Sequence, residues 1–113
     1  GVSVYGASKR TVNYINKSLK KELRGTGVKV GALYPGMVVT DLLIGDMDNM
    51  EPGEREQFRK IINILADPVE PVTEFLADRM LKNQKSGTRI SWLTTGKAVT
   101  KFLLASFRKR DLV

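Results

Sequence analysis

Hydrophobic residues recur at helical spacing in several stretches of the chain, and the longest of these stretches runs from Tyr5 to Leu23. In this first predicted helix one apolar stripe is expected to face a core. The opposite face is rich in lysine and arginine and is expected to face water. Gly25 follows in the position that favours a left-handed helix cap. The stripe consists of Ser8, Val12, Ile15, Leu19 and Leu23.

Two shorter stretches have the pattern of strands. Val28 to Tyr34 is apolar, β-branched and bounded by glycine and proline, which predicts a buried strand. Thr88 to Leu93 alternates in the manner of a second strand. A helix, a short turn and a strand in this order indicate part of a βαβ unit, and therefore an α/β fold with a parallel sheet.

Three more amphipathic helices are predicted between and after the strands. The first spans about Glu54 to Ala66, the second is opened by Pro71, and the third spans Ala98 to Phe107. Their apolar faces are expected to consist of Phe58, Ile61, Ile62 and Leu65 in the first, Val72, Phe75, Leu76 and Met80 in the second, and Val99, Phe102, Leu103 and Phe107 in the third.

The segment after the first strand contains residues that break regular structure. Pro35 lacks the donor that a sheet ladder would need, and Gly36 lets the backbone turn sharply or come close to a ligand. Gly45 to Gly53 is acidic, contains methionine and is full of helix breakers. We expect this stretch to be a mobile loop beside the end of the strand, in the manner of a lid.

The 113 residues of the chain are enough for one modest domain. The absence of cysteine and histidine excludes disulfides, thiol nucleophiles, the usual zinc sites and catalysis by imidazole, and no metal site is expected. No apolar run approaches the roughly 20 residues of a membrane-spanning helix. The start of the sequence shows no secretory signal pattern. These features favour a cytoplasmic protein.

The formal net charge is +7, but the positive residues are spread over helix faces instead of forming one patch with interleaved aromatic residues. This distribution weighs against a nucleic-acid partner. Arg108 to Arg110 is the one tight basic run, and it follows the last predicted helix. The terminal helix and basic tail, residues 97–113, are therefore an alternative candidate for binding a protein partner or an anionic membrane surface. Solvated arginines beside a packed helix explain the same pattern.

Tyr5 and Lys9 are the first candidate for chemistry. Residues four apart on a helix project from one face, so the phenol and the ammonium can share one site. A cation close to the phenol oxygen favours the ionised phenol, which suits a general acid or base. The same spacing also occurs by chance, with the tyrosine as an interface aromatic and the lysine as a solvated charge.

Three features in order resemble the carboxyl-terminal half of the short-chain dehydrogenase/reductase family. They are Tyr5-x-x-x-Lys9 at the opening of a long helix, a strand about one helix length later, and the sequence Pro35-Gly-Met-Val-Val-Thr40 directly after that strand, which matches P-G-x-V-x-T. The tail from Ile90 onward is loosely similar to the group that contains chlorophyll b reductases. The resemblance implies the carboxyl-terminal part of a doubly wound parallel-sheet Rossmann fold.

The resemblance implies an oxidoreductase that uses NAD or NADP to interconvert an alcohol and a carbonyl. By resemblance, Tyr5 is the general acid or base, and Lys9 holds the nicotinamide ribose and activates the tyrosine. Residues 41–66 would form the substrate loop and its helix, and the first helix would pair with its counterpart in a homo-oligomer. The residues expected to bind the cofactor are Tyr5, Lys9, Pro35, Gly36, Met37, Val38 and Thr40.

The sequence also departs from this family's pattern. It contains neither the glycine-rich dinucleotide loop nor a catalytic serine well upstream of Tyr5. It begins at Gly1 without an initiator methionine. We therefore expect residues 1–113 to be a single partial domain that is inactive by itself. Because two strands are marginal as a sheet, incomplete order, self-association or both are expected.

Overall fold

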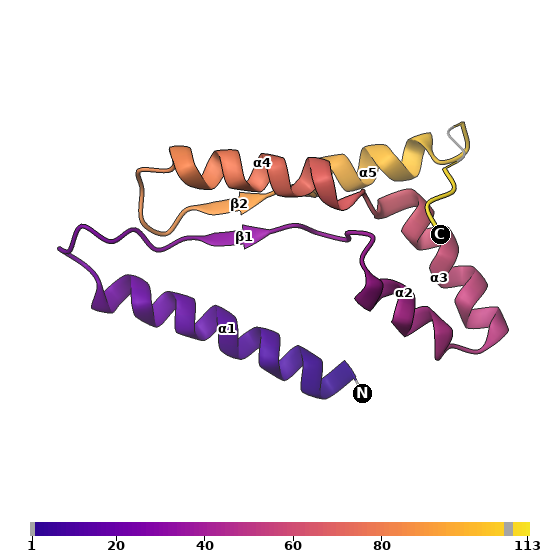
Figure 1. The fold of residues 1–113 in the computed structure, drawn as a ribbon, viewed down its shortest axis with the longest axis horizontal. Coiled ribbons are helices and arrows are strands. Elements are labelled where there is room, and N and C mark those ends of the chain that lie inside the picture. Colours follow the sequence, from indigo (N-terminus) through magenta and orange to yellow (C-terminus); the bar gives the residue numbers. More distant parts are fainter. Residues whose placement is uncertain (1, 108–109) are drawn as a thin grey trace.

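The chain is arranged around a two-stranded parallel sheet in a computed structural model that describes residues 2–107 and 110–113. The helix α4 covers one side of the strands, α1 lies along the other side, and α2 and α3 lie at one end (Figure 1). The elements in chain order are α1 (Val2–Glu22), β1 (Ala32–Tyr34), α2 (Asp41–Asp48), α3 (Pro52–Leu65), α4 (Val69–Lys82), β2 (Arg89–Ser91) and α5 (Thr95–Leu104).

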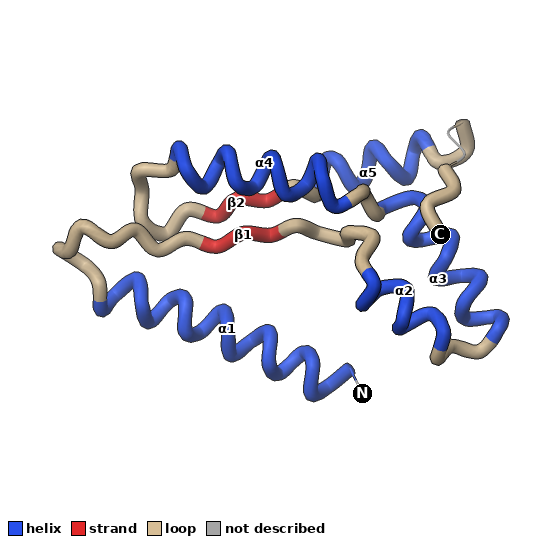
Figure 2. Tube along the Cα trace, viewed as in Figure 1, coloured by secondary structure: helices blue, strands red, loops and turns tan. Residues whose placement is uncertain are grey.

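The predicted parallel pairing is present, but each strand has only three residues. Leu33 of β1 lies opposite Ile90 of β2 at the centre of the ladder. The predicted strand from Val28 was too long at its start, because the carbonyl of Val30 instead accepts a hydrogen bond from the amide of Gly87 at 2.6 Å, in the turn before β2. Loop segments flank both short strands, and those around β1 are long (Figure 2). The arrangement is consistent with part of a Rossmann-like fold.

The core lies where α2 and α3 meet, rather than under the sheet. Met47, Ile62 and Ala66 form its buried centre. Met37, Val39, Leu43, Phe58, Leu112 and Val113 pack around that centre. The segment after β1 and the end of the chain are thus attached to the same cluster.

A second contact attaches α4 to β2. Val72 and Leu76 of α4 are buried, and the Phe75 ring meets the Trp92 ring edge to face at 5.3 Å. The prediction that Met80 faces inward was wrong, since this side chain is 50% exposed. The helix was expected to open at Pro71 but begins at Val69. Pro71 is tolerated there because it stands in the first turn, where no intrahelical donor is needed.

The prediction that Gly45 to Gly53 form a mobile loop was wrong, because residues 41–48 form α2. The Thr40 side chain caps this helix by accepting a hydrogen bond from the Leu43 amide at 3.4 Å. Met47 packs into the core from the same helix. The cap and this apolar contact outweigh the low helix propensity of Gly45.

The apolar stripe of α1 was expected to face a core, and this expectation was also wrong. Val12 and Ile15 are 60% and 49% exposed. The contacts between α1 and the sheet are polar, with the Asn16 side chain donating to the Gly31 carbonyl at 2.7 Å and the Tyr34 hydroxyl donating to Asn13 Oδ1 at 3.2 Å. Most of the stripe is therefore exposed. Gly25, with a φ of 84°, does occupy the left-handed cap that was predicted.

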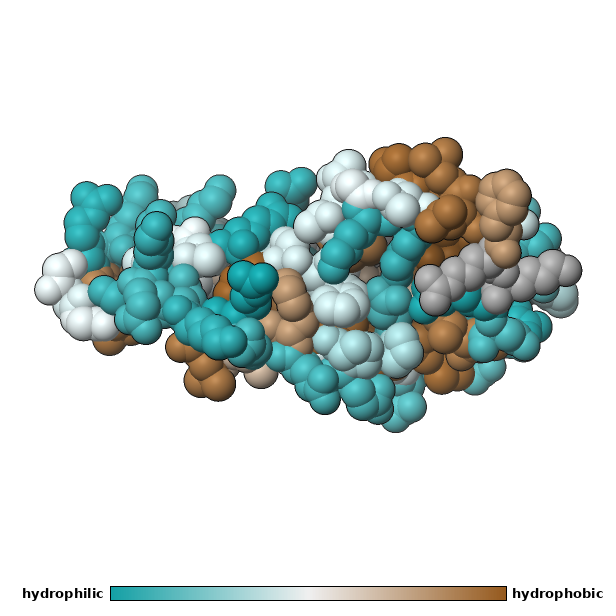
Figure 3. Space-filling model, turned by 90° about the horizontal axis from the view of Figure 1, so that it is seen from above, coloured by the Kyte–Doolittle hydropathy of each residue, from teal (hydrophilic) through white to brown (hydrophobic). Residues whose placement is uncertain are grey.

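The last helix was expected between Ala98 and Phe107 and lies three residues earlier, at Thr95–Leu104. Its apolar side is exposed, with Leu103 at 72% and Phe107, just beyond the helix, at 89%. Apolar side chains gather at the α5 end of the face that carries α4 and α5 (Figure 3). None of the helices in the described ranges combines the length and apolar character needed to cross a membrane.

Candidate functional site

The structure brings Tyr5 and Lys9 together on one side of α1. The Lys9 Nζ atom lies 5.2 Å from the centroid of the Tyr5 ring. Tyr5 is 58% exposed, so much of this residue is in contact with solvent. A phenol and an ammonium in this arrangement can take part together in proton transfer to an oxygen atom.

The bend after β1, residues 35–40, depends on the glycine at its second position. Gly36 has a φ of 77°, in the left-handed region that residues with a side chain rarely adopt. A Cβ atom at this position would lie 2.5 Å from Leu93 Cβ. The backbone can therefore follow this path beside Leu93 only with glycine at position 36.

After Gly36, the bend pairs with Asp67, which lies in the short connection between α3 and α4. Val38 and Asp67 form a parallel bridge, in which the Val39 amide donates to the Asp67 carbonyl and the Asp67 amide donates to the Met37 carbonyl, both at 3.1 Å. In such a bridge the amide and carbonyl of the central residue point the opposite way. The main-chain groups of Val38 thus lie on the edge of the bend away from Asp67.

Thr40 ends the bend and begins α2. Its hydroxyl oxygen accepts from the Leu43 amide, and a hydroxyl that accepts in this way can still donate its own hydrogen. The start of a helix also favours negative charge. Thr40 can therefore donate to an anionic oxygen placed before α2.

The carboxylate of Asp67 is the centre of a polar network that the sequence patterns did not indicate. It accepts hydrogen bonds from Trp92 Nε1 at 2.7 Å, from Lys101 Nζ at 2.6 Å and from Arg110 at 3.1 Å. The Asp67 side chain is only 13% exposed. The sequence places these residues far apart with no shared period, so no local pattern marked them as neighbours.

The network keeps Asp67 ionised. Burial alone raises the pKa of Asp67, but hydrogen bonds from Lys101, Trp92 and Arg110 and the Lys101 charge outweigh it and hold the pKa below its ordinary value. A carboxyl whose pKa is depressed by folding stabilises the fold above its unfolded pKa. That stability is lost as the pH falls through the folded pKa.

The basic run at 108–110 is only partly described. Arg108 and Lys109 lie outside the described residues. Arg110 pairs with Asp67 and its side chain is 20% exposed, so it is not a solvated arginine.

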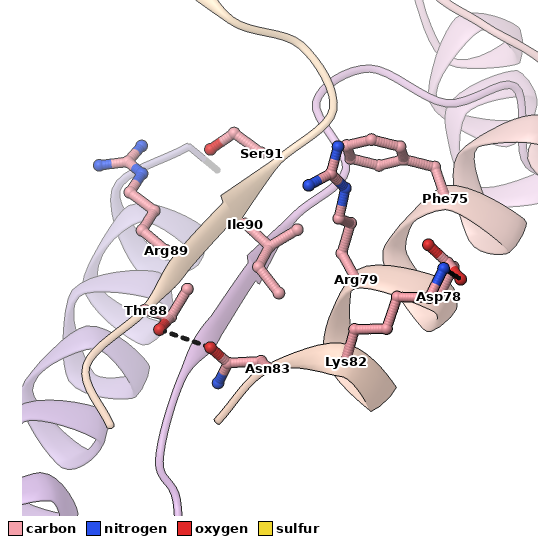
Figure 4. Close-up of a pocket in the computed structure, with 9 residues that line it drawn as sticks. All are labelled: Phe75, Asp78, Arg79, Lys82, Asn83, Thr88, Arg89, Ile90 and Ser91. Carbon is pink, nitrogen blue, oxygen red and sulfur yellow. Dashed lines mark hydrogen bonds and ion pairs between the residues drawn. The ribbon is translucent and has the colours of Figure 1, made fainter. Parts of the chain in front are cut away.

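Two of the cavities among the described residues lie elsewhere, and neither of these two is lined by Tyr5, Lys9 or residues 35–40. One, of about 360 Å³, lies between α3 and α5 beside Asp67 and Lys101. The other, of about 580 Å³, is an open groove between α4 and β2. Ile90 points from β2 toward α4 in this groove, and the Thr88 hydroxyl bonds Asn83 across its floor (Figure 4).

Comparisons with known proteins indicate which family this chain is similar to. Residues 1–51 match the family described as short chain dehydrogenase. The chloroplastic chlorophyll(ide) b reductase NOL of Arabidopsis thaliana is 42% identical over 106 residues, which cover 88% of this chain and 29% of that protein. The probable chloroplastic chlorophyll(ide) b reductase NYC1 of rice is 31% identical over 107 residues, covering 95% of this chain and 20% of that protein. No solved structure shows a significant match to the chain.

These comparisons confirm the resemblance to short-chain dehydrogenase/reductases, including the similarity to the chlorophyll b reductase group. The chain spans less than a third of the length of these plant relatives. The cytoplasmic location expected from the sequence is contradicted, because the plant relatives are chloroplastic proteins.

Proposed function

We propose that this chain is the carboxyl-terminal part of an NAD- or NADP-dependent short-chain reductase that converts a carbonyl to an alcohol. The observation that carries the proposal is the placement of Lys9 Nζ 5.2 Å from the Tyr5 ring, at the opening of the helix that precedes the P-G-x-V-x-T bend. The names of the plant relatives favour reduction over oxidation.

In this function Tyr5 gives a proton to the carbonyl oxygen as that oxygen becomes a hydroxyl. The ammonium of Lys9 stabilises the phenolate that remains, because opposite charges at short range favour the ionised form. Lys9 also has donors for the ribose hydroxyls of the cofactor. The nicotinamide supplies the hydride chemistry when bound.

The bend contributes binding groups on the edge that faces away from Asp67. The Val38 amide and carbonyl point away from Asp67, an orientation that suits an amide-bearing ring such as nicotinamide. Thr40 donates to a cofactor phosphate or to the carboxamide, and Pro35, Gly36 and Met37 set the path between them. Residues 35–40 follow the carboxyl end of a parallel strand, where α/β sheets bind ligands.

The substrate would lie against residues 41–66, which are α2, α3 and the turn between them. Because the chain spans less than a third of the length of the plant relatives, turnover is proposed for the complete gene product. The exposed stripe of α1, including Val12 and Ile15, supports self-association through this helix.

Lys9 gives the first test. In the complete gene product, Lys9→Gln should weaken binding of NADH or NADPH by roughly tenfold or more, because a charge-assisted hydrogen bond is lost. Titration with each reduced cofactor, followed by cofactor fluorescence, measures the two dissociation constants and identifies the preferred cofactor. Lys17→Gln, which removes an exposed lysine from the same helix, is the matched control. Equal affinities in the two variants would remove Lys9 from the site.

The exposed apolar side of α5 favours a second candidate function, binding to a membrane surface. Phe102, Leu103 and Phe107 are exposed on this side, and the sequence continues into Arg108 and Lys109. A helix with an exposed apolar face and nearby basic residues can lie in the interface of an anionic bilayer.

Vesicle co-sedimentation tests this candidate. Binding to vesicles of anionic lipid should be strong at low salt, weaken as salt is added, and fall further in Leu103→Asp. Vesicles of neutral lipid and the variant Leu81→Asp, at another exposed leucine, are the controls. Binding that ignores both salt and lipid charge would exclude the membrane surface.

A further inference from the structure

Asp67 is attached to the cofactor bend through its main chain. Its amide and carbonyl take both hydrogen bonds of the bridge, one with Met37 and one with Val39. These two bonds hold one edge of residues 37–39. The opposite edge, which carries the main-chain groups of Val38, is thereby oriented outward.

The carboxylate of the same residue is held by donors from three other parts of the chain. Trp92 follows β2, Lys101 belongs to α5, and Arg110 lies in the tail beyond α5. All three donors are within 3.1 Å of a carboxylate oxygen. Lys101 Nζ also donates to the Leu65 carbonyl at 2.9 Å, at the end of α3.

These two sets of bonds meet in one residue. We propose that Asp67 is a positioning residue for the cofactor: its carboxylate, held by Trp92, Lys101 and Arg110, fixes the main chain that orients residues 37–39. The proposal rests on the proposed function, because it assigns the bend to cofactor binding. Asp67 acts through the bend and does not touch the cofactor or the substrate.

The charge of Asp67 is essential to this role. Lys101 and Arg110 are largely buried, at 23% and 20% side-chain exposure, and their positive charges face the one carboxylate. Replacing the carboxylate by an amide leaves two buried cations without a counter-charge, which drives them toward solvent and loosens the peptide that they hold. The bend would then keep its sequence and lose its fixed orientation.

Asp67→Asn in the complete gene product tests the proposal with two independent measurements. Hydrogen exchange at the Val39 amide, which donates to the Asp67 carbonyl, should speed up roughly tenfold. The KM for the reduced cofactor should rise by about tenfold with kcat changed much less, because positioning of the bound cofactor is the property that is lost. Asp67→Glu keeps the charge and should recover part of both effects.

Asp78→Asn is the matched control, since Asp78 also pairs with a lysine but lies exposed on α4, away from the bend. Asp78→Asn should leave both measurements unchanged. An unchanged Val39 exchange rate in Asp67→Asn would overturn the proposal. Faster exchange with an unaltered KM would also overturn the proposal. The proposed function would remain intact in that case, because the variant would still turn over its substrate. A wild-type protein that binds neither cofactor would instead refute the proposed function itself.

Discussion

Replacing Tyr5 by phenylalanine should abolish turnover in the complete gene product while leaving cofactor binding nearly intact. Proton transfer by a positioned side chain contributes roughly 10²–10⁴-fold to rate, so kcat should fall by at least about 100-fold. The phenylalanine ring keeps the contact with Lys9, whose Nζ lies over the ring. The cofactor groups held by Lys9 and the bend should therefore bind as before.

The measurement is steady-state oxidation of the reduced cofactor with a carbonyl substrate, together with cofactor titration of the same preparation. Tyr14→Phe removes a hydroxyl from another exposed tyrosine of the same helix and should leave both quantities unchanged. Turnover that persists in Tyr5→Phe would remove this residue from catalysis.

Gly36→Ala should have the largest effect on the bend. An alanine at a φ of 77° costs roughly 1–3 kcal/mol in the backbone alone, and its Cβ would lie 2.5 Å from Leu93 Cβ. Either the bend or the segment after β2 has to shift. We expect a melting temperature several degrees below that of the wild type and a marked loss of cofactor affinity.

Gly45→Ala is the matched control for this change. Gly45 lies inside α2, and a Cβ atom there would meet nothing within 4 Å. The same substitution should therefore stabilise the protein by roughly 0.5–1 kcal/mol through helix propensity. Equal melting temperatures for Gly36→Ala and the wild type would show that the bend does not require glycine.

Local patterns in the sequence were sufficient for most of the fold. Apolar residues at helical spacing located α3, α4 and α5 to within a few residues, and Gly25 marked the end of the first helix. Short stretches with the apolar or alternating pattern of strands located both strands. These features depend on neighbours in the sequence, which is why the sequence alone could predict them.

Predictions that depended on distant neighbours succeeded less often. The stripe through Val12 and Ile15 required a core that α1 does not meet in this chain, and the helix at 41–48 required the burial of Met47 against α3. For the candidate site, the spacing of Tyr5 and Lys9 predicted their proximity, because the helix itself provides it. Asp67 could not have been identified in this way, because its partners come from three separate segments.

A crystal structure of the complete gene product with its oxidised cofactor would test the central claim most directly. The nicotinamide ring is predicted to lie within reach of the Tyr5 hydroxyl, with Lys9 Nζ at the ribose hydroxyls and the carboxamide against the main chain of Val38. A nicotinamide bound away from both Tyr5 and the bend at residues 35–40 would contradict the proposed function.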